Sequence, residues 1–294
     1  MKTVVMTGAT AGLGAVAARH ITRSPHTRLV AGSRGNPVEG AELEPLDLGQ
    51  LASTRTFAEN VRTRLGDTLI DVLVLNAGIS APGDSPTTAD GYETVFATNH
   101  LAHYLLLRLL ERWLSPEGTV IVTTSDTHDP RINRLAPPRH AYADLLAVPY
   151  RGSGYRSVFR AYATSKLCNL LTARAFARLS EANGNHISVV AYNPGFTPET
   201  GLNRDAGPAV RMLMRGLTPL AGRFVPINTV EEAGRSLADL ALGQAQAPDG
   251  RIYASLVRGQ LTWPDPSLLA QSDDAMTSLW QESAGLVGLD RPHP

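Results

Sequence analysis

The stretch TVVMTGATAGLGAVAARH at residues 3–20 decides the fold of this chain. An apolar run, TVVMT, leads directly into a glycine-rich turn and then into a segment with helical spacing, and the turn residues of interest are Gly8, Gly12, Leu13 and Gly14. Glycines let the backbone turn tightly and approach a phosphate, while the N-terminus of the next helix offers unpaired N–H groups. The stretch therefore predicts a strand, a phosphate-binding turn and a helix. A plain connector would look similar, so the rest of the chain must decide between the two.

Further apolar runs alternate with helix-period segments along the chain. The runs lie at 3–7, 28–32, 43–47, 71–76, 119–124, 187–192 and 251–257, and helices are expected at 12–23, 50–65, 88–114, 160–182, 230–242 and 275–286. The runs are near-continuously apolar, as parallel strands covered on both faces are. The pattern predicts an α/β chain with a doubly wound Rossmann fold and a seven-stranded, mostly parallel sheet with helices on both faces.

We expect a single domain over residues 1–294, with two segments that depart from the regular pattern. The first is a substrate-side insertion at 128–160, and the second is a substrate loop and helix region at 196–229. Long irregular segments in compact domains are usually functional or disordered. Five side chains in them either wall an apolar pocket or simply pack: Tyr142, Tyr150, Tyr155, Met212 and Met214. With Leu213 and Leu217, the two methionines suggest an amphipathic helix.

The composition points to a small-molecule partner. Lys plus Arg and Asp plus Glu number 27 each in 294 residues, so no global charge draws the chain to nucleic acid or to an anionic membrane. The most apolar stretch, residues 101–110, is too short to span a bilayer. Cys168 is the single cysteine and suits a reducing compartment. We therefore expect a cytoplasmic protein with no nucleic-acid or membrane partner.

The ends of the next three strands bear residues suited to a dinucleotide. Ser33 and Arg34 follow the second strand, where NAD-binding proteins usually carry an acidic residue. Arg34 would grip a 2'-phosphate and Ser33 would donate a hydrogen bond, which favours NADPH over NADH, although Arg34 could equally be an exposed turn arginine. After the third strand, Asp47 and Leu48 could bound the adenine. Three residues end the fourth strand on the same edge: Asn76, Ala77 and Gly78.

Tyr162 and Lys166, in YATSK, lie four residues apart at helical spacing and so share one helix face. Only two residues of the chain are lysine, so the other 25 of its 27 basic residues are arginine. An ammonium near a phenol favours the phenolate, and moving a tyrosine pKa from about 10 to about 7 takes about 4 kcal/mol. Tyr162 would then donate a proton to a carbonyl oxygen as hydride arrives. A surface pair is the alternative.

Two more polar residues complete a candidate catalytic set. Ser125 ends the fifth strand, where its hydroxyl could hold the reacting oxygen beside the tyrosine. Asn99 lies on the preceding helix, where its amide could connect Lys166 to a water chain. Taken singly, Ser125 could be a loop serine and Asn99 a core amide. Their order after a phosphate-binding turn favours the catalytic interpretation.

Together these motifs resemble the short-chain dehydrogenase/reductase family over about 250 residues. They are TGATAGLG, LD at 47, NAG at 76, TNHLAH from 98, the serine at 125, YATSK, and NPG at 193. The resemblance implies a catalytic tetrad of Asn99, Ser125, Tyr162 and Lys166. It also implies that Lys166 bonds the nicotinamide ribose and that Pro194 and Gly195 flank the nicotinamide. Family members often pair through the helices at 88–114 and 160–182, so a homodimer or homotetramer is implied.

Within the family, SKLCNLL, YNPGFTPETGL and the tail SDDAMTSLWQESAGLVGLD resemble the branch of retinol dehydrogenases and light-dependent protochlorophyllide reductases. That branch handles large apolar substrates with NADPH, whereas its photoactive enzymes have several cysteines and this chain has one. The sequence therefore predicts an NADPH-dependent carbonyl reductase for a bulky apolar, polycyclic ketone or aldehyde. The alternatives are an NAD-linked alcohol dehydrogenase and an NADPH-sensing regulator without chemistry.

Four other residues are candidates for metal binding, substrate contact or core packing. His100 and His103 stand three apart on a helix, but no third ligand has suitable spacing, so no metal site is predicted. His128 could contact substrate or face solvent. Cys168 is turned off the Tyr162 and Lys166 face and is expected to be a packed core thiol.

Overall fold

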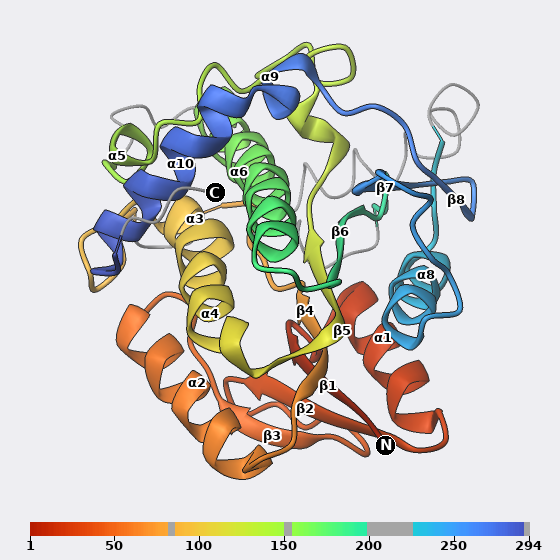
Figure 1. The fold of residues 1–294 in the computed structure, drawn as a ribbon. Helices are drawn as coiled ribbons and strands as arrows, with labels where there is room; N and C mark the ends of the chain where they lie inside the picture. The colour runs from red at the N-terminus through yellow and green to blue at the C-terminus, as the bar shows by residue number, and fades with distance from the viewer. Residues whose placement is uncertain (82–85, 150–154, 199–225, 291–294) are drawn as a thin grey trace.

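The computed structural model describes residues 1–81, 86–149, 155–198 and 226–290. Its centre is an eight-stranded sheet in the order β3-β2-β1-β4-β5-β6-β7-β8 (Figure 1). The strands are β1 Lys2–Thr7, β2 Thr27–Ser33, β3 Glu42–Pro45, β4 Ile70–Leu75, β5 Leu114–Thr123, β6 Ser188–Asn193, β7 Tyr253–Val257 and β8 Gln260–Thr262. All pair in parallel except β8, which is antiparallel to β7. The strand order reverses between β1 and β4, which confirms the doubly wound α/β fold.

The sheet has one strand more than predicted. β8 follows β7 through a two-residue turn in which Arg258 (φ 50°) and Gly259 (φ 73°) both have positive φ. This backbone matches the twist of a tight hairpin. The three residues of β8 are too few and too exposed to give an apolar run, so the sequence pattern predicts no strand after β7.

Two hydrophobic cores lie on opposite faces of the sheet. α1 Gly12–Arg23 and α8 Val230–Leu242 pack over one face. α2 Leu51–Leu65, α4 Ala102–Leu110, α6 Tyr155–Ala182 and α10 Asp273–Leu286 cover the other. The bounds of α1 and α8 agree with the sequence prediction, and the residues between β2 and β3 form the expected loop. No helix within the described ranges is long and apolar enough to cross a bilayer.

The helix predicted at 88–114 is shorter and less regular than expected. Residues 88–93 form a turn around Gly91 (φ 84°), and a bridge joins Thr87 to Glu93. The Glu93 side chain accepts a hydrogen bond from the backbone of Phe96, which starts the helix. The elements that follow are α3 Thr94–Phe96, a π-helical turn at Ala97–Leu101, α4, and a 3₁₀ turn at Glu111–Trp113. β5 begins directly after it.

The two irregular segments are described only in part. The insertion begins at the last residue of a 3₁₀ turn, Asp126–His128, and contains α5 Ala143–Leu146 and the first turn of α6. Tyr142 and Tyr155 are exposed and stack on His140 and Phe159. Tyr150 and the predicted amphipathic helix with its methionines lie outside the described residues.

The C-terminal segment, with α9 Leu268–Gln271 and α10, lies along α4 and α6 (Figure 1). Trp280 of α10 is buried, its ring meets the Tyr104 ring edge-on at 4.8 Å, and the Tyr104 hydroxyl donates to its carbonyl at 2.9 Å. The family resemblance implied subunit pairing through these same two helices. In this chain, α10 occupies part of that face.

Candidate active site

The glycine turn after β1 is shaped by the absence of side chains. Gly8 and Gly12 have φ of 70° and 55°, a conformation that favours glycine. A Cβ on Gly14 would lie 1.9 Å from the Gly8 carbonyl oxygen, which is far inside any permitted contact. The Asn76 amide donates to that oxygen at 3.1 Å and holds the turn against the end of β4.

The N-terminus of α1 has the features of an anion-binding site. Its N-cap residue, Ala11, offers no side-chain hydrogen bond, and the first turn carries no acidic residue. By contrast, α8 begins with a complete capping box of Thr229 and Glu232. Neither the N-cap side chain nor an acidic residue of the first turn therefore accepts from the first N–H groups of α1, which form the positive end of the helix dipole, so this turn fits a phosphate group.

The Asn76–Gly78 turn at the end of β4 lies beside the glycine turn. The backbone N–H groups of Asn76 and Ala77 donate to the Thr7 hydroxyl at 3.0 and 3.2 Å. A Cβ on Gly78 would lie 3.2 Å from the Lys166 ammonium nitrogen and 3.3 Å from Asn99 Oδ1. Gly78 thus allows the predicted cofactor turn to touch two of the predicted catalytic residues.

The predicted adenosine-side residues lie at the ends of β2 and β3. Ser33 is buried, and its hydroxyl donates to the Asn36 carbonyl at 2.8 Å, so it is already engaged in its own turn. Arg34 is exposed. The Asp47 carboxylate accepts from the Gly49 backbone at 3.0 Å, and Leu48 is buried. Of these four side chains, the charged side chain of Arg34 is the one that is exposed.

Tyr162, Lys166 and Ser125 meet where β5 ends against α6. Tyr162 and Lys166 are both buried, and the ammonium nitrogen lies 5.8 Å from the centre of the phenol ring. That nitrogen donates to the Thr123 carbonyl at 3.2 Å. Ser125 accepts a hydrogen bond from Thr127 at 3.3 Å and so begins the 3₁₀ turn. The structure brings the three predicted side chains to one point.

Burial perturbs both ionisable groups of this cluster. It lowers the pKa of Lys166 to about 8, so the side chain is mostly cationic at neutral pH. Burial also raises the pKa of Tyr162; a side-chain hydrogen bond with Ser125 opposes this shift, and the charge of Asp126 adds to it. The lowered phenol pKa expected from the sequence is therefore not present in the chain by itself, because desolvation outweighs the hydrogen bond with Ser125. A phenol in this state holds its proton, as a general acid must.

Asn99 lies in the π-helical turn, and its amide is fully engaged with the protein. Its Oδ1 accepts from the Ile79 backbone at 2.8 Å, while Nδ2 donates to the Ile79 carbonyl and to the Ser165 hydroxyl, each at 2.9 Å. Asn99 thus ties the turn after β4 to the helix that carries Tyr162. Its part in a proton relay stays a prediction.

The two histidines beside Asn99 use their ring nitrogens within the protein. His103 contacts the Thr7 hydroxyl at 2.9 Å and the Asn99 carbonyl at 3.0 Å, and His100 contacts the Ser283 hydroxyl at 2.9 Å. Burial lowers the pKa of His103 to about 4 and that of His100 to about 3, so both are neutral at pH 7. Across the described ranges, no group of three or more potential ligands is arranged for a metal ion.

Neither sequence interpretation of His128 agrees with the structure, because its side chain is not exposed to solvent and its ring is packed within the protein. It is buried, its Nδ1 lies 2.6 Å from the Ser125 carbonyl, and its ring packs edge-on against Tyr253 at 5.2 Å. Its ring therefore supports the backbone of Ser125. Cys168 is confirmed as a buried core thiol, and burial raises its pKa.

Pro194 and Gly195 lie at the same edge of the sheet as Ser125. Thr123 pairs with Tyr192 in the parallel β5–β6 ladder, so Ser125 and Pro194 each lie two residues beyond a paired position at the carboxyl edge of the sheet, and their neighbours Asp126 and Asn193 form a side-chain hydrogen bond. Gly195 has φ of 67° and donates its N–H to the Asn193 side chain at 3.0 Å. The predicted nicotinamide-side turn thus borders the predicted catalytic residues.

Several contributing residues were missed from the sequence. Thr123 connects the two halves of the site, because its hydroxyl donates to Asn76 at 3.0 Å while its carbonyl accepts from Lys166 and from Asn169. Asp126 lies next to Ser125, and its charge raises the pKa of Tyr162. The Asn228 side chain donates a hydrogen bond to the Pro194 carbonyl. Their signal would have been a polar residue inside or next to an apolar run, which is also typical of simple core hydrogen bonding.

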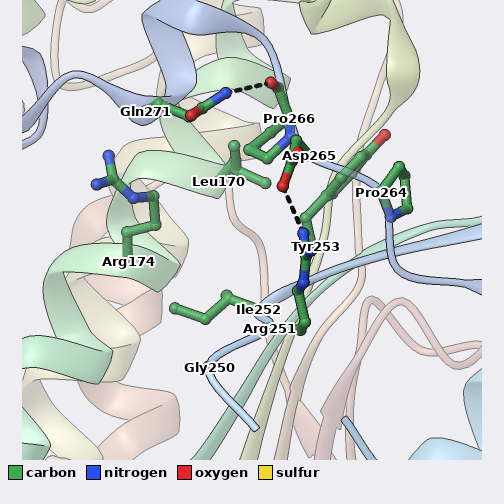
Figure 2. Close-up of a pocket in the computed structure, with 10 residues that line it drawn as sticks. All are labelled: Leu170, Arg174, Gly250, Arg251, Ile252, Tyr253, Pro264, Asp265, Pro266 and Gln271. Atoms are coloured by element: carbon green, nitrogen blue, oxygen red, sulfur yellow. Dashed lines mark hydrogen bonds and ion pairs between the residues drawn. The ribbon is translucent and has the colours of Figure 1, made fainter. Parts of the chain in front are cut away.

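A separate cavity of about 140 Å³ lies between α6, the start of β7, the segment before α9 and the last residue of α9 (Figure 2). Its lining is Leu170, Arg174, Gly250, Arg251, Ile252, Tyr253, Pro264, Asp265, Pro266 and Gln271. An ion pair between Arg251 and Asp265, and a hydrogen bond from Gln271 to the Pro266 carbonyl, cross its rim. None of the predicted site residues lines it, so it is distinct from the candidate active site.

Comparison with known proteins assigns the class. A family model described as short chain dehydrogenase matches residues 2–135. A chloroplastic protochlorophyllide reductase A from Oryza sativa subsp. japonica is 34% identical over 322 residues, which cover 97% of this chain and 80% of that protein. This chain belongs to the short-chain dehydrogenase/reductase family. It is an NAD(P)-dependent oxidoreductase of that family, similar to the protochlorophyllide reductases.

Solved structures agree on the fold. An uncharacterized protein from Mycobacterium paratuberculosis has a TM-score of 0.73 and 28% identity, covering 99% of this chain and 95% of that chain. A short chain dehydrogenase from Burkholderia cenocepacia J2315, solved in complex with NADP, has a TM-score of 0.60 and 18% identity, covering 88% and 97%.

Proposed function

We propose that this protein is an NADPH-dependent carbonyl reductase that acts on a bulky apolar, polycyclic ketone or aldehyde. One observation carries the proposal: a buried phenol, a buried ammonium and a serine hydroxyl converge beside a glycine turn whose helix N-terminus has no cap. A phosphate, a reducible carbonyl and a proton donor would then all lie at the carboxyl edge of the sheet, where ligands of this fold bind.

Each residue of the proposed tetrad has one task. NADPH, when bound, supplies the hydride for the carbonyl carbon. Ser125 orients the carbonyl oxygen, and Tyr162 gives that oxygen its proton, so one carbonyl becomes one alcohol. Lys166 keeps a positive charge beside the phenol, which stabilises the phenolate left behind until solvent returns a proton. Asn99 holds the π-helical turn and the loop at Ile79 against the catalytic helix.

The chain's own residues also suggest how the cofactor would be held. The turn of Gly8, Gly12, Leu13 and Gly14 would receive the diphosphate, and the Asn76–Gly78 turn would lie along the cofactor. Asp47 and Leu48 would bound the adenine, and Pro194 and Gly195 the nicotinamide. These assignments rest on the family pattern together with the open N-terminus of α1.

A substrate screen with a matched variant tests the reaction. NADPH oxidation would be followed against a panel of aromatic and polycyclic ketones, with protochlorophyllide included. We expect turnover of at least one ketone, and a loss of about 10² to 10⁴-fold for Tyr162→Phe without loss of NADPH binding. Full turnover by the variant on a substrate of the native protein would contradict the role of Tyr162.

Reduction of protochlorophyllide is a second candidate, favoured by the 34% identical relative that bears that name. Activity on that pigment, without activity on any ketone, would replace carbonyl reduction as the proposed function. The photoactive enzymes are expected to carry several cysteines, whereas the single thiol here, Cys168, is buried in the core.

The preference for NADPH rests on Arg34. Its exposed guanidinium would pair with a 2'-phosphate, so Arg34→Ala should weaken NADPH binding about tenfold and leave NADH binding unchanged. Calorimetry with both cofactors measures this, and Arg112→Ala, at another exposed arginine, is the control. Tighter binding of NADH than NADPH by the native protein would favour NAD-linked alcohol oxidation.

We further propose action in the cytoplasm on a small-molecule substrate, without nucleic acid or membrane. A free, buried thiol suits a reducing compartment. Whether the chain forms a homodimer or homotetramer stays a prediction that sedimentation would test, since α10 takes up part of the face of α4 and α6.

A further inference from the structure

Asn228 lies between β6 and α8, and its side chain hydrogen-bonds to three backbone groups in two separate segments. It is 1% exposed. Its Nδ2 donates to the Pro194 carbonyl at 2.9 Å and to the Leu256 carbonyl at 2.8 Å, and its Oδ1 accepts from the Gly259 N–H at 3.0 Å. One amide therefore joins the turn after β6 to the hairpin of β7 and β8.

The backbone of Asn228 adds a fourth contact, because its N–H donates to the Phe196 carbonyl at 3.0 Å. Phe196 also forms an isolated parallel bridge with Ile227. Asn228 thus hydrogen-bonds to both ends of the turn at 194–196, at the Pro194 and Phe196 carbonyls. An amide is needed, because only an amide offers two donors and an acceptor in one short planar group.

Gly195 shows how closely Asn228 approaches this turn. A Cβ on Gly195 would lie 2.4 Å from Asn228 Nδ2 and 2.5 Å from the Leu256 carbonyl oxygen. The glycine at this position is therefore required by the amide behind it as well as by its φ of 67°. The same turn begins at the carboxyl edge of the sheet, where the Asn193 side chain hydrogen-bonds to Asp126, the neighbour of Ser125.

We infer that Asn228 is a positioning residue for the nicotinamide half of the cofactor. It fixes the height of Pro194 and Gly195 above the sheet, and hence the distance of the hydride donor from the carbonyl beside Ser125 and Tyr162. The inference rests on the proposed function, because it takes the Pro194 turn as the nicotinamide neighbour. It concerns no residue on the diphosphate or adenosine side.

The test compares a whole cofactor with one that lacks the nicotinamide. Calorimetry would measure the affinity of Asn228→Asp, which keeps the shape but loses both donors, for NADPH and for 2'-phospho-ADP-ribose. We expect NADPH to bind about tenfold more weakly and 2'-phospho-ADP-ribose to bind within twofold of the native value. Asn185→Asp, at an exposed position, is the matched control and should change neither affinity.

Asn228→Ser, with its smaller side chain, serves as the second variant should Asn228→Asp fail to fold, as judged by circular dichroism. Equal weakening of both ligands, or unchanged NADPH affinity in a folded variant, would overturn the inference. Failure of the native protein to bind either ligand would instead overturn the proposed function. The two failures are therefore distinguishable.

Discussion

The two walls of the candidate site are built on opposite principles. The glycine wall, residues 7–14 and 76–78, is formed by backbone that approaches backbone, and the missing Cβ of Gly14 leaves room for the Gly8 carbonyl. The catalytic wall, residues 99–103, 123–125 and 162–169, is formed by buried side chains. Burial there shifts their pKa values, as with the ammonium of Lys166, whose pKa falls to about 8.

This difference teaches which substitutions each wall tolerates. The glycine wall is sensitive to added volume, because there is no space into which a new atom could move. The catalytic wall is sensitive to changes of chemistry at constant volume or charge, because each polar group has a specific partner. Four predictions test this contrast.

The largest effect is expected for Gly14→Ala. Its methyl group would clash with the Gly8 carbonyl at 1.9 Å, so the start of α1 must shift. We expect the free energy of unfolding to fall by about 3 kcal/mol and NADPH binding to be lost. Urea unfolding and calorimetry measure both. Gly66→Ala, which meets open space at φ 57°, should cost about 1 kcal/mol and keep binding. Equal losses in the two variants would show that the clash is relieved.

The next effect tests chemistry at constant charge, with Lys166→Arg. The buried ammonium nitrogen donates to the Thr123 carbonyl at 3.2 Å, and a planar guanidinium, whose N–H donors point in fixed directions, does not reproduce this single-point contact. We expect kcat to fall by about 100-fold or more. The chain offers a matched control in its other lysine, because Lys2 donates to the Leu242 carbonyl with its side chain part-exposed. Lys2→Arg should keep native turnover, and turnover retained in both variants would refute the prediction.

The third prediction concerns the stability of the catalytic wall in acid. The folded pKa of His103 lies near 4, below its ordinary 6.5, so the unfolded chain takes up a proton first as the pH falls. The stability present above pH 6.5 is therefore lost between pH 6.5 and 4, by about 3 kcal/mol. Urea unfolding at pH 6.5 and 4.5 should show a shallower loss in His103→Gln than in the native protein. His186→Gln, at an exposed position, should retain the native slope.

The smallest effect is expected where the two walls join, at Thr123. Thr123→Val removes the hydroxyl that donates to Asn76 at 3.0 Å while keeping the side chain's shape. We expect a loss of about 1 kcal/mol in unfolding free energy and a few-fold weaker NADPH binding. Thr123→Ser keeps the hydroxyl and should bind NADPH as the native protein does. If valine and serine behave alike, the two walls are not coupled through this bond.

Local patterns along the chain were enough to predict much of the fold. The apolar runs located the seven parallel strands, and the bounds of α1 and α8 agree because both helices begin and end at clear local signals. The predictions failed where the signal was not local. The turn at 88–93 and the hairpin strand β8 depend on positive φ at Gly91, Arg258 and Gly259. The identity of these residues and their neighbours does not fix the sign of φ.

The sequence by itself determined the fold class, the glycine turn and the spacing of Tyr162 and Lys166, because strand and helix periods are local properties. Tertiary structure decided how these parts interact. It placed His128 behind Ser125, joined the two walls through Thr123, and set the Asn228 amide against Gly195. Burial among distant segments lowered the pKa of Lys166 and, together with the charge of Asp126, raised that of Tyr162, since desolvation depends on every element packed around a group.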